Sequence, residues 1–432
     1  MLKILKESIF KIGLNRRNPS LAEHYAFLKD SEKWPREKLQ QYQWEKLKET
    51  LDYAYRHSAY YRRKWDEAGI RPEMIRTAED VKKIPVITKE ELIKFNDEIH
   101  SDEYFPKQFF SITSGTTGQS LSFWKDENAD SRNRAAIFRG YSWYDVKPWE
   151  FNGYFWGFNF SFWKKLKTRI MDWLVNRYRL FSYDEKSFKK FVKKIRKAAY
   201  LEGYSSAIYQ TAKLINEKGL PKPGKLKMVK GTSEKIYPYY QEEVKKAFGK
   251  PMIGEYGAAE AGLIAFECPA GNLHIHTEGV YVEEENGEII VTNLVMRSFP
   301  VVRYRLGDMI KLKPADYTCP CGMAHPVIEE ITGRVGKTVY GKKNIYPSFT
   351  FYYVFKNLKQ NHNIQLGYQV HQKEKGRLEF YLERPLNERE ETVLRKEIEA
   401  LFGDDVDYSI FVDEEMFLNK KKKFRDFISY LK

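Results

Sequence analysis

The residues best suited to chemistry form one short stretch of small hydroxyl side chains and glycines, between residues 113 and 118. They are Thr113, Ser114, Gly115, Thr116, Thr117 and Gly118. Glycine lets the backbone bend sharply and approach a ligand closely, because it has no Cβ atom. Successive N–H groups and hydroxyls in such a loop make a concavity suited to anionic oxygens. No Lys follows the second glycine, so the stretch is not a GxxxxGK(S/T) phosphate loop. By itself it fits phosphate binding and an ordinary hairpin turn equally well.

Two carboxylates farther along the chain could assist a phosphate site. Glu260 lies in the Gly/Ala-rich stretch 255–262, after the apolar residues 252–254, and the pattern predicts a strand that runs into a loop. A carboxylate at the C-terminal edge of a sheet can hold Mg²⁺ together with phosphate oxygens, whereas the alternative is a solvated Glu in a turn. Asp308 could accept hydrogen bonds from vicinal ribose hydroxyls, although Gly-Asp is also common in turns.

The three cysteines suggest a metal site. Cys268, Cys319 and Cys321 together with His274 make a Cys₃His set, which suits tetrahedral Zn²⁺ in a structural role. His276 and His325 are alternative fourth ligands, and three unrelated free thiols are the other interpretation. Three cysteines cannot make a disulfide framework, so we expect a reducing, cytoplasmic compartment.

Composition bounds the remaining classes of function. The chain has 432 residues, 42% hydrophobic, with 74 Lys and Arg against 59 Asp and Glu, for a net charge of +15. It is therefore long enough for at least two domains and is not disordered. The positive charge favours acidic partners. No apolar run reaches the roughly 18 residues of a membrane-spanning helix. Residues 162–180 predict a basic amphipathic helix, which could lie on an anionic membrane or pack against a core.

Periodicity predicts an α/β fold in two parts. Residues 37–67 have helical spacing, and Thr88 with Glu91 has the spacing of a capping box at a helix start. Strand and helix patterns alternate over 203–248, and 279–313 predict an antiparallel sheet. After about residue 334 the pattern is that of a small α+β domain. We therefore expect a large N-terminal domain of mixed sheets and helices, residues 1–334, and a small mobile α+β domain, residues 337–432.

The order and spacing of these motifs resemble the adenylate-forming (acyl-CoA synthetase) superfamily. The stretches 51–62, 84–89 and 203–207 are similar to the phenylacetate–CoA ligase branch, in particular its CapK-like members. The resemblance extends over about residues 40–432. It also takes in Gly333-Arg334, where a hinge would lie, Asn344–Pro347 on the mobile side, and the lysine run 420–423.

The resemblance implies a role for each candidate residue. The loop 113–118 would cradle the β- and γ-phosphates of ATP, and Gly231, Ser233 and Glu234 would run along the adenine. Tyr256 and Gly257 would pack beside the adenine, Glu260 would hold Mg²⁺, and Asp308 would bind the ribose with the help of Arg334. Lys423 would bridge the substrate carboxylate and the α-phosphate, although the choice among the four lysines stays open. The catalytic residues are then Thr116, Glu260 and Lys423.

The function that follows is ATP-dependent activation of a carboxylic acid. An acyl-AMP forms with release of pyrophosphate, and CoA then displaces AMP to give an acyl-CoA thioester. The alternative acceptor is an amine or hydroxyl of a surface polysaccharide precursor, because CapK-like members are associated with capsule synthesis. A basic module that binds nucleic acid or a membrane is a third, disfavoured interpretation, and we expect no nucleic-acid partner. Peripheral membrane contact and a homodimer are compatible with the resemblance.

Overall fold

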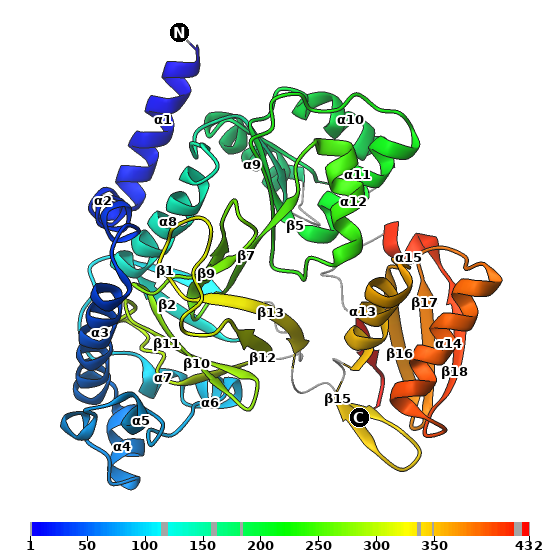
Figure 1. Cartoon of the computed structure of the whole chain (residues 1–432). Coiled ribbons are helices and arrows are strands. Elements are labelled where there is room, and N and C mark those ends of the chain that lie inside the picture. Colours follow the sequence, from blue (N-terminus) through cyan, green and yellow to red (C-terminus); the bar gives the residue numbers. More distant parts are fainter. Residues whose placement is uncertain are drawn as a thin grey trace. The chain divides into compact units, whose positions relative to one another are not determined.

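The chain is organised as two compact units, each assembled from two separate stretches. The computed structural model describes residues 2–113, 120–156, 162–181, 185–334, 338–347, 350–418 and 426–431. The first unit contains Met1–Pro148 and Glu255–Ile331, and the second contains Trp149–Gly254 and Thr332–Lys432. Both contain helices and sheets, which confirms the predicted α/β class (Figure 1). The division into domains 1–334 and 337–432 stays a prediction.

Helices dominate the N-terminal stretch of the first unit. They are α1 (Leu2–Arg17), α2 (Leu21–Ser31), α3 (Arg36–His57), α4 (Ala59–Glu67), the short 3₁₀ helix η1 (Pro72–Met74), α5 (Ala78–Val81), α6 (Lys89–Lys94), α7 (Asn96–Ile99) and α8 (Glu127–Ser142). The predicted helix over 37–67 is confirmed, with a break at Ser58, whose extended backbone separates α3 from α4. The capping box is also confirmed, since Thr88 and Glu91 satisfy each other's backbone N–H at the start of α6.

The strands of the first unit are mostly antiparallel. β1 (Gln108–Ile112) and β2 (Ser122–Asp126) form a two-stranded hairpin, with Ile112 opposite Ser122. The larger run has the order β10-β11-β12-β13-β9-β8-β7. Its strands are β7 (Met252–Ala258), β8 (Gly262–Glu267), β9 (Leu273–Ile275), β10 (Val280–Glu285), β11 (Glu288–Asn293), β12 (Tyr304–Leu312) and β13 (Val327–Arg334). The predicted antiparallel sheet over 279–313 is confirmed by the pairing of β10, β11 and β12.

The second unit begins with a parallel sheet in the order β6-β5-β3-β4. Its elements are β3 (Asn152–Phe155), α9 (Phe162–Leu174), β4 (Arg177–Arg179), α10 (Glu185–Ile195), β5 (Tyr200–Tyr204), α11 (Ser205–Glu217), β6 (Met228–Thr232) and α12 (Pro238–Phe248). The predicted helix over 162–180 is too long. Asn176 has a left-handed backbone, with φ of 57°, and the chain then enters β4.

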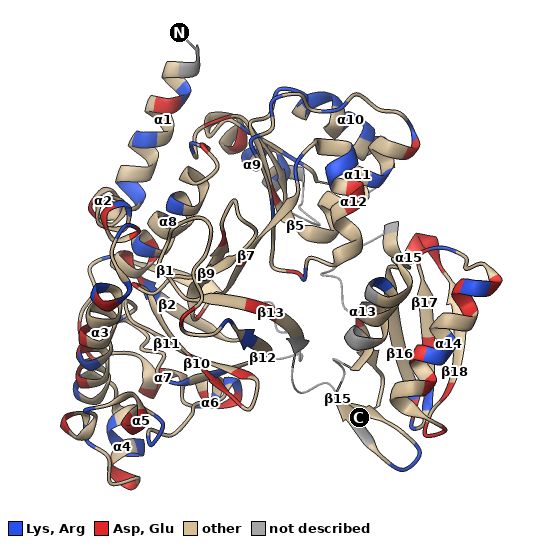
Figure 2. Ribbon diagram, in the orientation of Figure 1, with Lys and Arg blue, Asp and Glu red and all other residues tan. Residues whose placement is uncertain are grey.

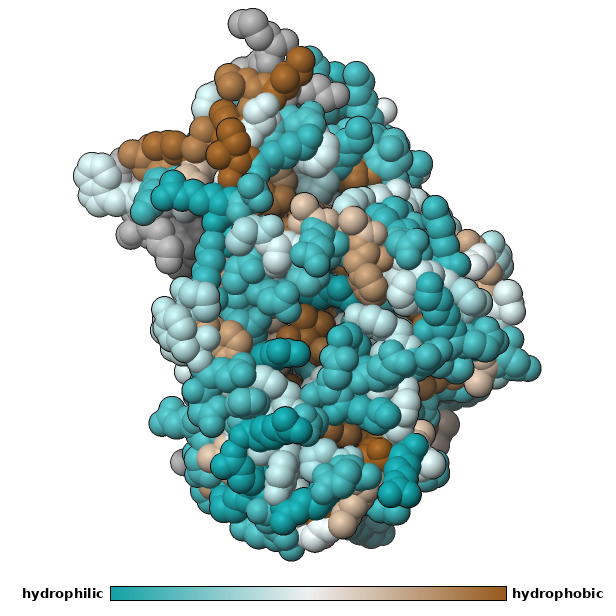
Figure 3. Space-filling model, turned by 90° about the vertical axis from the view of Figure 1, so that its left-hand side faces the viewer, coloured by the Kyte–Doolittle hydropathy of each residue, from teal (hydrophilic) through white to brown (hydrophobic). Residues whose placement is uncertain are grey.

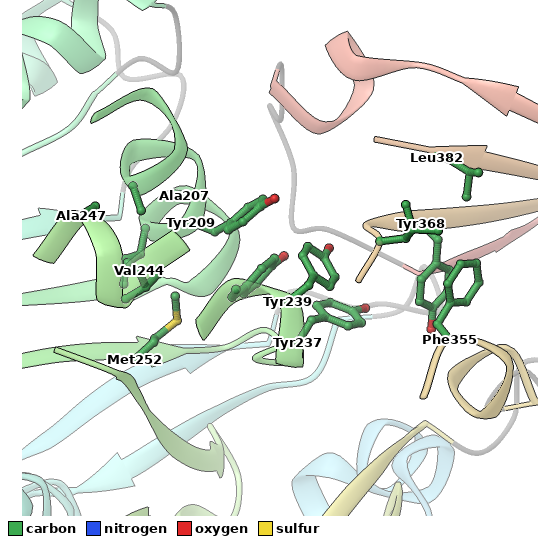
Figure 4. Packing of buried hydrophobic residues seen from close by; sticks show 14 of the residues in the cluster. Ala207, Tyr209, Tyr237, Tyr239, Val244, Ala247, Met252, Phe355, Tyr368 and Leu382 are labelled. Atoms are coloured by element: carbon green, nitrogen blue, oxygen red, sulfur yellow. The ribbon is translucent and has the colours of Figure 1, made fainter. Parts of the chain in front are cut away.

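The C-terminal stretch adds a four-stranded sheet in the order β18-β17-β16-β19, together with a separate hairpin. The elements are β14 (Thr338–Tyr340), β15 (Ile345–Pro347), α13 (Thr350–His362), β16 (Tyr368–Glu374), β17 (Arg377–Leu382), α14 (Glu388–Phe402), β18 (Asp407–Val412), α15 (Glu414–Leu418) and β19 (Phe427–Ser429). Asn387 caps α14, because its side chain accepts from the backbone N–H of Glu390. Figure 4 shows part of the core of this unit, where Phe355 and Tyr368 stack with ring centroids 3.6 Å apart.

Candidate functional site

Tyr256 and Asp308 are brought together by two strands of the first unit. Tyr256 lies on β7 and Asp308 on β12, and the Tyr256 hydroxyl donates a hydrogen bond of 2.8 Å to Asp308 Oδ2. Gly307, which precedes Asp308, has a φ of 80°, a conformation that favours glycine. The register between β11 and β12 shifts at this point, so the Gly-Asp pair lies in an irregular strand rather than in the turn that its composition suggested.

Glu260 lies at the tip of the β7–β8 hairpin and is buried, with 5% of its surface exposed. Its Oε1 accepts a hydrogen bond of 2.9 Å from the hydroxyl of Tyr304 on β12. The predicted strand that runs into a loop is confirmed, because β7 ends at Ala258 and a short turn that contains Glu260 leads into β8. A Cβ atom at Gly257 would come within 2.4 Å of the Gly262 carbonyl oxygen, so the tight hairpin requires glycine there.

The predicted adenine-side residues follow β6 in the second unit. Ser233 has a φ of 65°, and the Glu234 carboxylate accepts a 2.9 Å hydrogen bond from the backbone N–H of Ser206 at the start of α11. The Ser205 hydroxyl donates to the Glu234 carbonyl oxygen at 3.3 Å. A Cβ at Gly231 would lie 2.5 Å from Ser205 Oγ, which explains the need for glycine. These contacts fix the C-terminal edge of a parallel strand, where ligands of α/β folds commonly bind.

Thr113 is the part of the phosphate-loop candidate that the structure describes. Its backbone N–H donates to the Leu121 carbonyl at 2.8 Å, and its hydroxyl accepts from the Leu121 N–H at 3.0 Å. Thr113 therefore closes the base of the loop between β1 and β2. The predicted residues Ser114, Gly115, Thr116, Thr117, Gly118 and Lys423, and the Arg334 side chain, lie outside what the structure describes.

The predicted metal ligands form one compact cluster in the first unit. The ligand atoms of Cys268, His274, Cys319 and Cys321 all lie within 4.8 Å of one another. Cys268 and Cys319 place their Sγ atoms 3.8 Å apart, and Cys321 Sγ lies 3.2 Å from His274 Nε2. His274 Nδ1 is 2.9 Å from the His325 carbonyl oxygen, so Nδ1–H donates there and Nε2 faces the sulfurs.

The two competing histidines have other partners. His276 Nδ1 lies 3.1 Å from Arg139 Nη2, and His325 Nδ1 lies 3.0 Å from Thr277 Oγ1. The geometry therefore groups His274, rather than His276 or His325, with the three sulfurs.

Burial favours the neutral forms of Cys268, Cys321 and His274 in the metal-free protein. Burial raises the pKa of the Cys268 thiol and raises the pKa of Cys321 to about 12. Burial also lowers the pKa of His274. A cation would replace these protons, because thiolate and neutral imidazole are the forms that bind metal. Three sulfurs and one nitrogen in a closed cluster match the donor set of structural Zn²⁺.

Two partners of the site residues had no signal in the sequence. Tyr304 orients Glu260, and Ser206 holds Glu234, in each case across more than 25 residues of chain. The local sequence pattern indicates that Tyr304 is an ordinary buried strand residue. The pattern around Ser206 is that of an ordinary residue in the first turn of a helix. The pairing of distant elements, rather than any local pattern, gives them their roles.

Comparison with known proteins bears on this arrangement. No family model matches the chain. Protein CapK from Staphylococcus aureus is 23% identical over 298 residues, which are 63% of this chain and 64% of CapK. Phenylacetate-coenzyme A ligase from Thermus thermophilus is 35% identical over 95 residues, which are 20% of this chain and 19% of that ligase. The match thus spans less than two thirds of either relative.

Solved structures agree on the fold. The 2-hydroxyisobutyryl-CoA ligase in its postadenylation state, in complex with R3-HIB-AMP, matches with a TM-score of 0.72 at 16% identity, over 92% of this chain and 91% of that one. The chain has the fold of an acyl-CoA ligase. The same ligase in its thioesterification state, with 2-HIB-AMP and CoA, matches with a TM-score of 0.58 at 17% identity, over 92% and 91%. The predicted fold is confirmed, and the curated relatives carry the names of the branch that the motifs resemble.

Proposed function

We propose that the chain is an ATP-dependent ligase that activates a carboxylic acid as an acyl-AMP. The observation that carries this proposal is the hydrogen bond between Tyr256 and Asp308, with Glu260 held by Tyr304 on the same strand as Asp308. An aromatic ring, a ribose-binding carboxylate and a buried carboxylate suit the adenine, the sugar and the metal of ATP–Mg²⁺. The fold of a ligase solved with an acyl-AMP supports the same assignment.

The chemistry needs stabilisation of charge more than it needs a covalent nucleophile. The acid oxygen attacks the α-phosphate, pyrophosphate leaves, and negative charge is spread over the phosphate oxygens in the transition state. Glu260 is buried and forms no ion pair with a Lys, Arg or His among the residues that the structure describes, so it fits a role as a ligand of Mg²⁺. Bound there, Mg²⁺ would neutralise phosphate charge. Lys423 and the hydroxyl of Thr116 are the proposed groups of this chain that contact the reacting phosphate and carboxylate.

The second half-reaction transfers the acyl group. CoA is the proposed acceptor, because phenylacetate-coenzyme A ligases are among the relatives and a matching ligase has been solved with CoA. The alternative acceptor is an amine or hydroxyl of a surface polysaccharide precursor. It is favoured by the length of the match to CapK, which exceeds the 95 residues matched in the Thermus ligase.

Exchange of labelled pyrophosphate into ATP, which depends on the acid, tests the activation step. The purified chain should catalyse exchange with at least one acid in a broad panel, and Glu260→Gln should lower the rate by about 10²–10³ because a charge partner of the transition state is lost. Glu73→Gln, at an exposed position, is the matched control. No exchange with any acid would contradict the proposal. Addition of CoA or of amine acceptors to the preformed acyl-AMP then distinguishes the two acceptors.

We also propose that the Cys₃His cluster holds a structural Zn²⁺. The supporting observations are the short distances between its four ligand atoms and the hydrogen bond of 3.3 Å that the Asn272 amide donates to Cys319 Sγ. Such a donor stabilises a thiolate and fixes its orientation. The cluster joins the turn after β8 to the segment before β13, so the metal would cross-link two loops that are separate in the sequence.

Peripheral membrane contact is proposed for α9. Its apolar side chains are exposed, including Trp163 at 76% and Ile170 at 55%, and Lys165 and Lys167 lie on the same helix. Among the described residues, no helix is long and apolar enough to cross a membrane. An exposed face with Trp and Lys favours an anionic lipid surface. Sedimentation with vesicles that contain phosphatidylglycerol, compared with phosphatidylcholine vesicles, tests the contact.

Two further surfaces bear on such contacts. Figure 2 shows Lys and Arg positions along α10. A hollow of about 580 Å³ beside this helix is lined by four lysines: Lys186, Lys189, Lys190 and Lys193. On the face drawn in Figure 3, hydrophobic surface gathers toward the upper end, while most of the face is hydrophilic.

A homodimer is a further proposal, and light scattering of the purified chain tests it.

A further inference from the structure

Two neighbouring cavities of the first unit lie beside the proposed site of activation. The smaller, of about 20 Å³, is lined by Ala261 and Gly262, which directly follow Glu260. The larger, of about 670 Å³, lies among α2, α3, α8 and residues 294–297. The two share Arg132, Val295 and Met296 as lining residues. If Glu260 holds the metal of ATP, the smaller cavity lies next to that metal ligand in the chain, because Ala261 and Gly262 line it.

Lys125 brings a cation to the smaller cavity. It is half-buried on β2, on the same face as Phe123, which is 1% exposed, and it lines the smaller cavity. No ion pair is found for its ammonium among the described residues. Burial lowers the pKa of Lys125, while Glu260 and two aspartates partly offset this effect. A negatively charged ligand would stabilise the charged form of a Lys in this position.

Arg132 brings a second cation, from α8. It is 6% exposed, and its Nε finds no hydrogen-bond partner in the part of the chain that the structure describes. Its other nitrogens make only long contacts with neutral groups, at 3.3 Å to the Tyr42 hydroxyl, 3.3 Å to the Glu278 carbonyl and 3.4 Å to His24 Nδ1. His276, whose Nε2 is buried and has no hydrogen-bond partner among the described residues, also lines the smaller cavity. A buried donor such as the Nε–H group of Arg132 is costly unless an acceptor reaches it.

The carboxylates around the larger cavity are, in contrast, already engaged. Asp126 accepts from the N–H groups of Ala129, Arg297 and Ser298, Glu127 from Ser20, Glu103 from Tyr53, Glu49 from Lys46, and Glu278 from Arg139. The Arg297 guanidinium lies 5.0 Å from the centre of the Tyr53 ring, and no carboxylate pairs with it among the described residues. The acidic groups are thus satisfied within the fold. Arg132 and Arg297, in contrast, still have N–H donors available for a ligand.

We propose that the acid which the chain activates carries a second anionic group, bound between Lys125 and Arg132 where the smaller cavity meets the larger one. The rest of the acid extends into the larger cavity toward Arg297. This inference rests on the proposed function and names its substrate class. The larger cavity, of about 670 Å³, falls within the size range of small-molecule pockets and therefore has room for the rest of the acid. The second group is a carboxylate or a phosphate, since both accept from Lys and Arg.

The experiment compares matched acids in pyrophosphate exchange by the full chain. Glutarate and 4-phosphonobutyrate are each measured against pentanoate. We expect kcat/KM for at least one anionic acid to exceed that for pentanoate about 10- to 100-fold, as for a hydrogen bond to a charged group. Lys125→Met should lower this ratio by at least about tenfold. Lys83→Met, at an exposed lysine, is the control and should leave the ratio unchanged.

The outcomes separate this inference from the function on which it rests. If exchange with pentanoate is at least as fast as with both anionic acids, the inference is overturned, but the proposed ligase function is still supported. A ratio that Lys125→Met does not change also overturns it. No exchange with any acid overturns both. A thermal shift of the unreacted chain gives a second readout: glutarate or 4-phosphonobutyrate should raise the melting temperature of the wild type more than that of Lys125→Met, and pentanoate should not.

Discussion

The hydroxyl of Tyr256 donates a 2.8 Å hydrogen bond to Oδ2 of Asp308, which joins the strand before the Glu260 hairpin to the irregular strand β12. One carboxylate oxygen is thereby fixed by the protein, so the orientation of the whole group is set before a nucleotide binds. Preorganisation of this kind reduces the entropy that binding must overcome.

Substitutions at this pair should weaken ATP binding by different amounts. We expect Asp308→Ala to raise KM for ATP about 10- to 100-fold, because hydrogen bonds from the ribose to a charged acceptor are lost. Tyr256→Phe keeps the ring and should raise KM only about 3- to 10-fold. Because Tyr256 acts partly through Asp308, the double variant should be less impaired than the product of the two effects. ATP titrations of the exchange rate measure all three.

The control for this pair is Tyr430→Phe, at a position that is 56% exposed. It should leave KM for ATP at the wild-type value. If Asp308→Ala left KM for ATP unchanged, that result would contradict the assignment of Asp308 as the ribose ligand. Exchange activity itself would still support a ligase.

Tyr304 should act as a positioning residue for Glu260. Tyr304→Phe deletes the hydroxyl that donates to Glu260 Oε1 at 2.9 Å and leaves a buried carboxylate less well oriented. We expect the Mg²⁺ concentration for half-maximal exchange to rise about 10-fold or more, as for outer partners of metal ligands. A purely structural role would lower the melting temperature without a change in Mg²⁺ dependence, and that result would contradict the assignment.

The sequence allowed the elements and the order of the motifs to be predicted, because both depend on local signals. The capping box at Thr88 is an example, since its side chain bonds only three residues away. Contacts set by distant pairing could not be predicted. Tyr304 meets Glu260 only through the register of the sheet, and Ser206 meets Glu234 only because β5 and β6 run parallel.

One prediction from the local pattern was wrong because the pairing of strands overrides that pattern. Residues 162–180 keep a helical pattern, yet a left-handed Asn176 ends the helix and β4 joins the parallel sheet. His274, His276 and His325 could not be ranked as ligands by spacing, because the hydrogen bond from His274 Nδ1 to a distant carbonyl decides which nitrogen faces the sulfurs.

Zinc should bind at about one ion per chain and stabilise the first unit. Chain purified without chelator and measured by mass spectrometry should contain it, and less than about 0.2 zinc per chain would contradict the site. His274→Gln should lower both metal content and the melting temperature, the latter by roughly 5–10 °C, because a structural metal contributes directly to folding. His362→Gln, on α13, is the matched control. Exchange activity should follow the folded fraction, since the cluster has no proposed role in catalysis.

The buried pair of Arg139 and Glu278 should be costly to break from one side only. Arg139 Nη1 lies 2.6 Å from Glu278 Oε1, and the two side chains are 3% and 0% exposed. Arg139→Met leaves the Glu278 charge buried with fewer partners, and we expect the free energy of unfolding to fall by about 3–5 kcal/mol. Arg139→Met with Glu278→Gln removes both charges and should recover part of that loss. Urea denaturation of the single and double variants measures the difference. A double variant less stable than Arg139→Met would show that Glu278 is held mainly by its other neighbours, the Ser31 hydroxyl and the ring of His276.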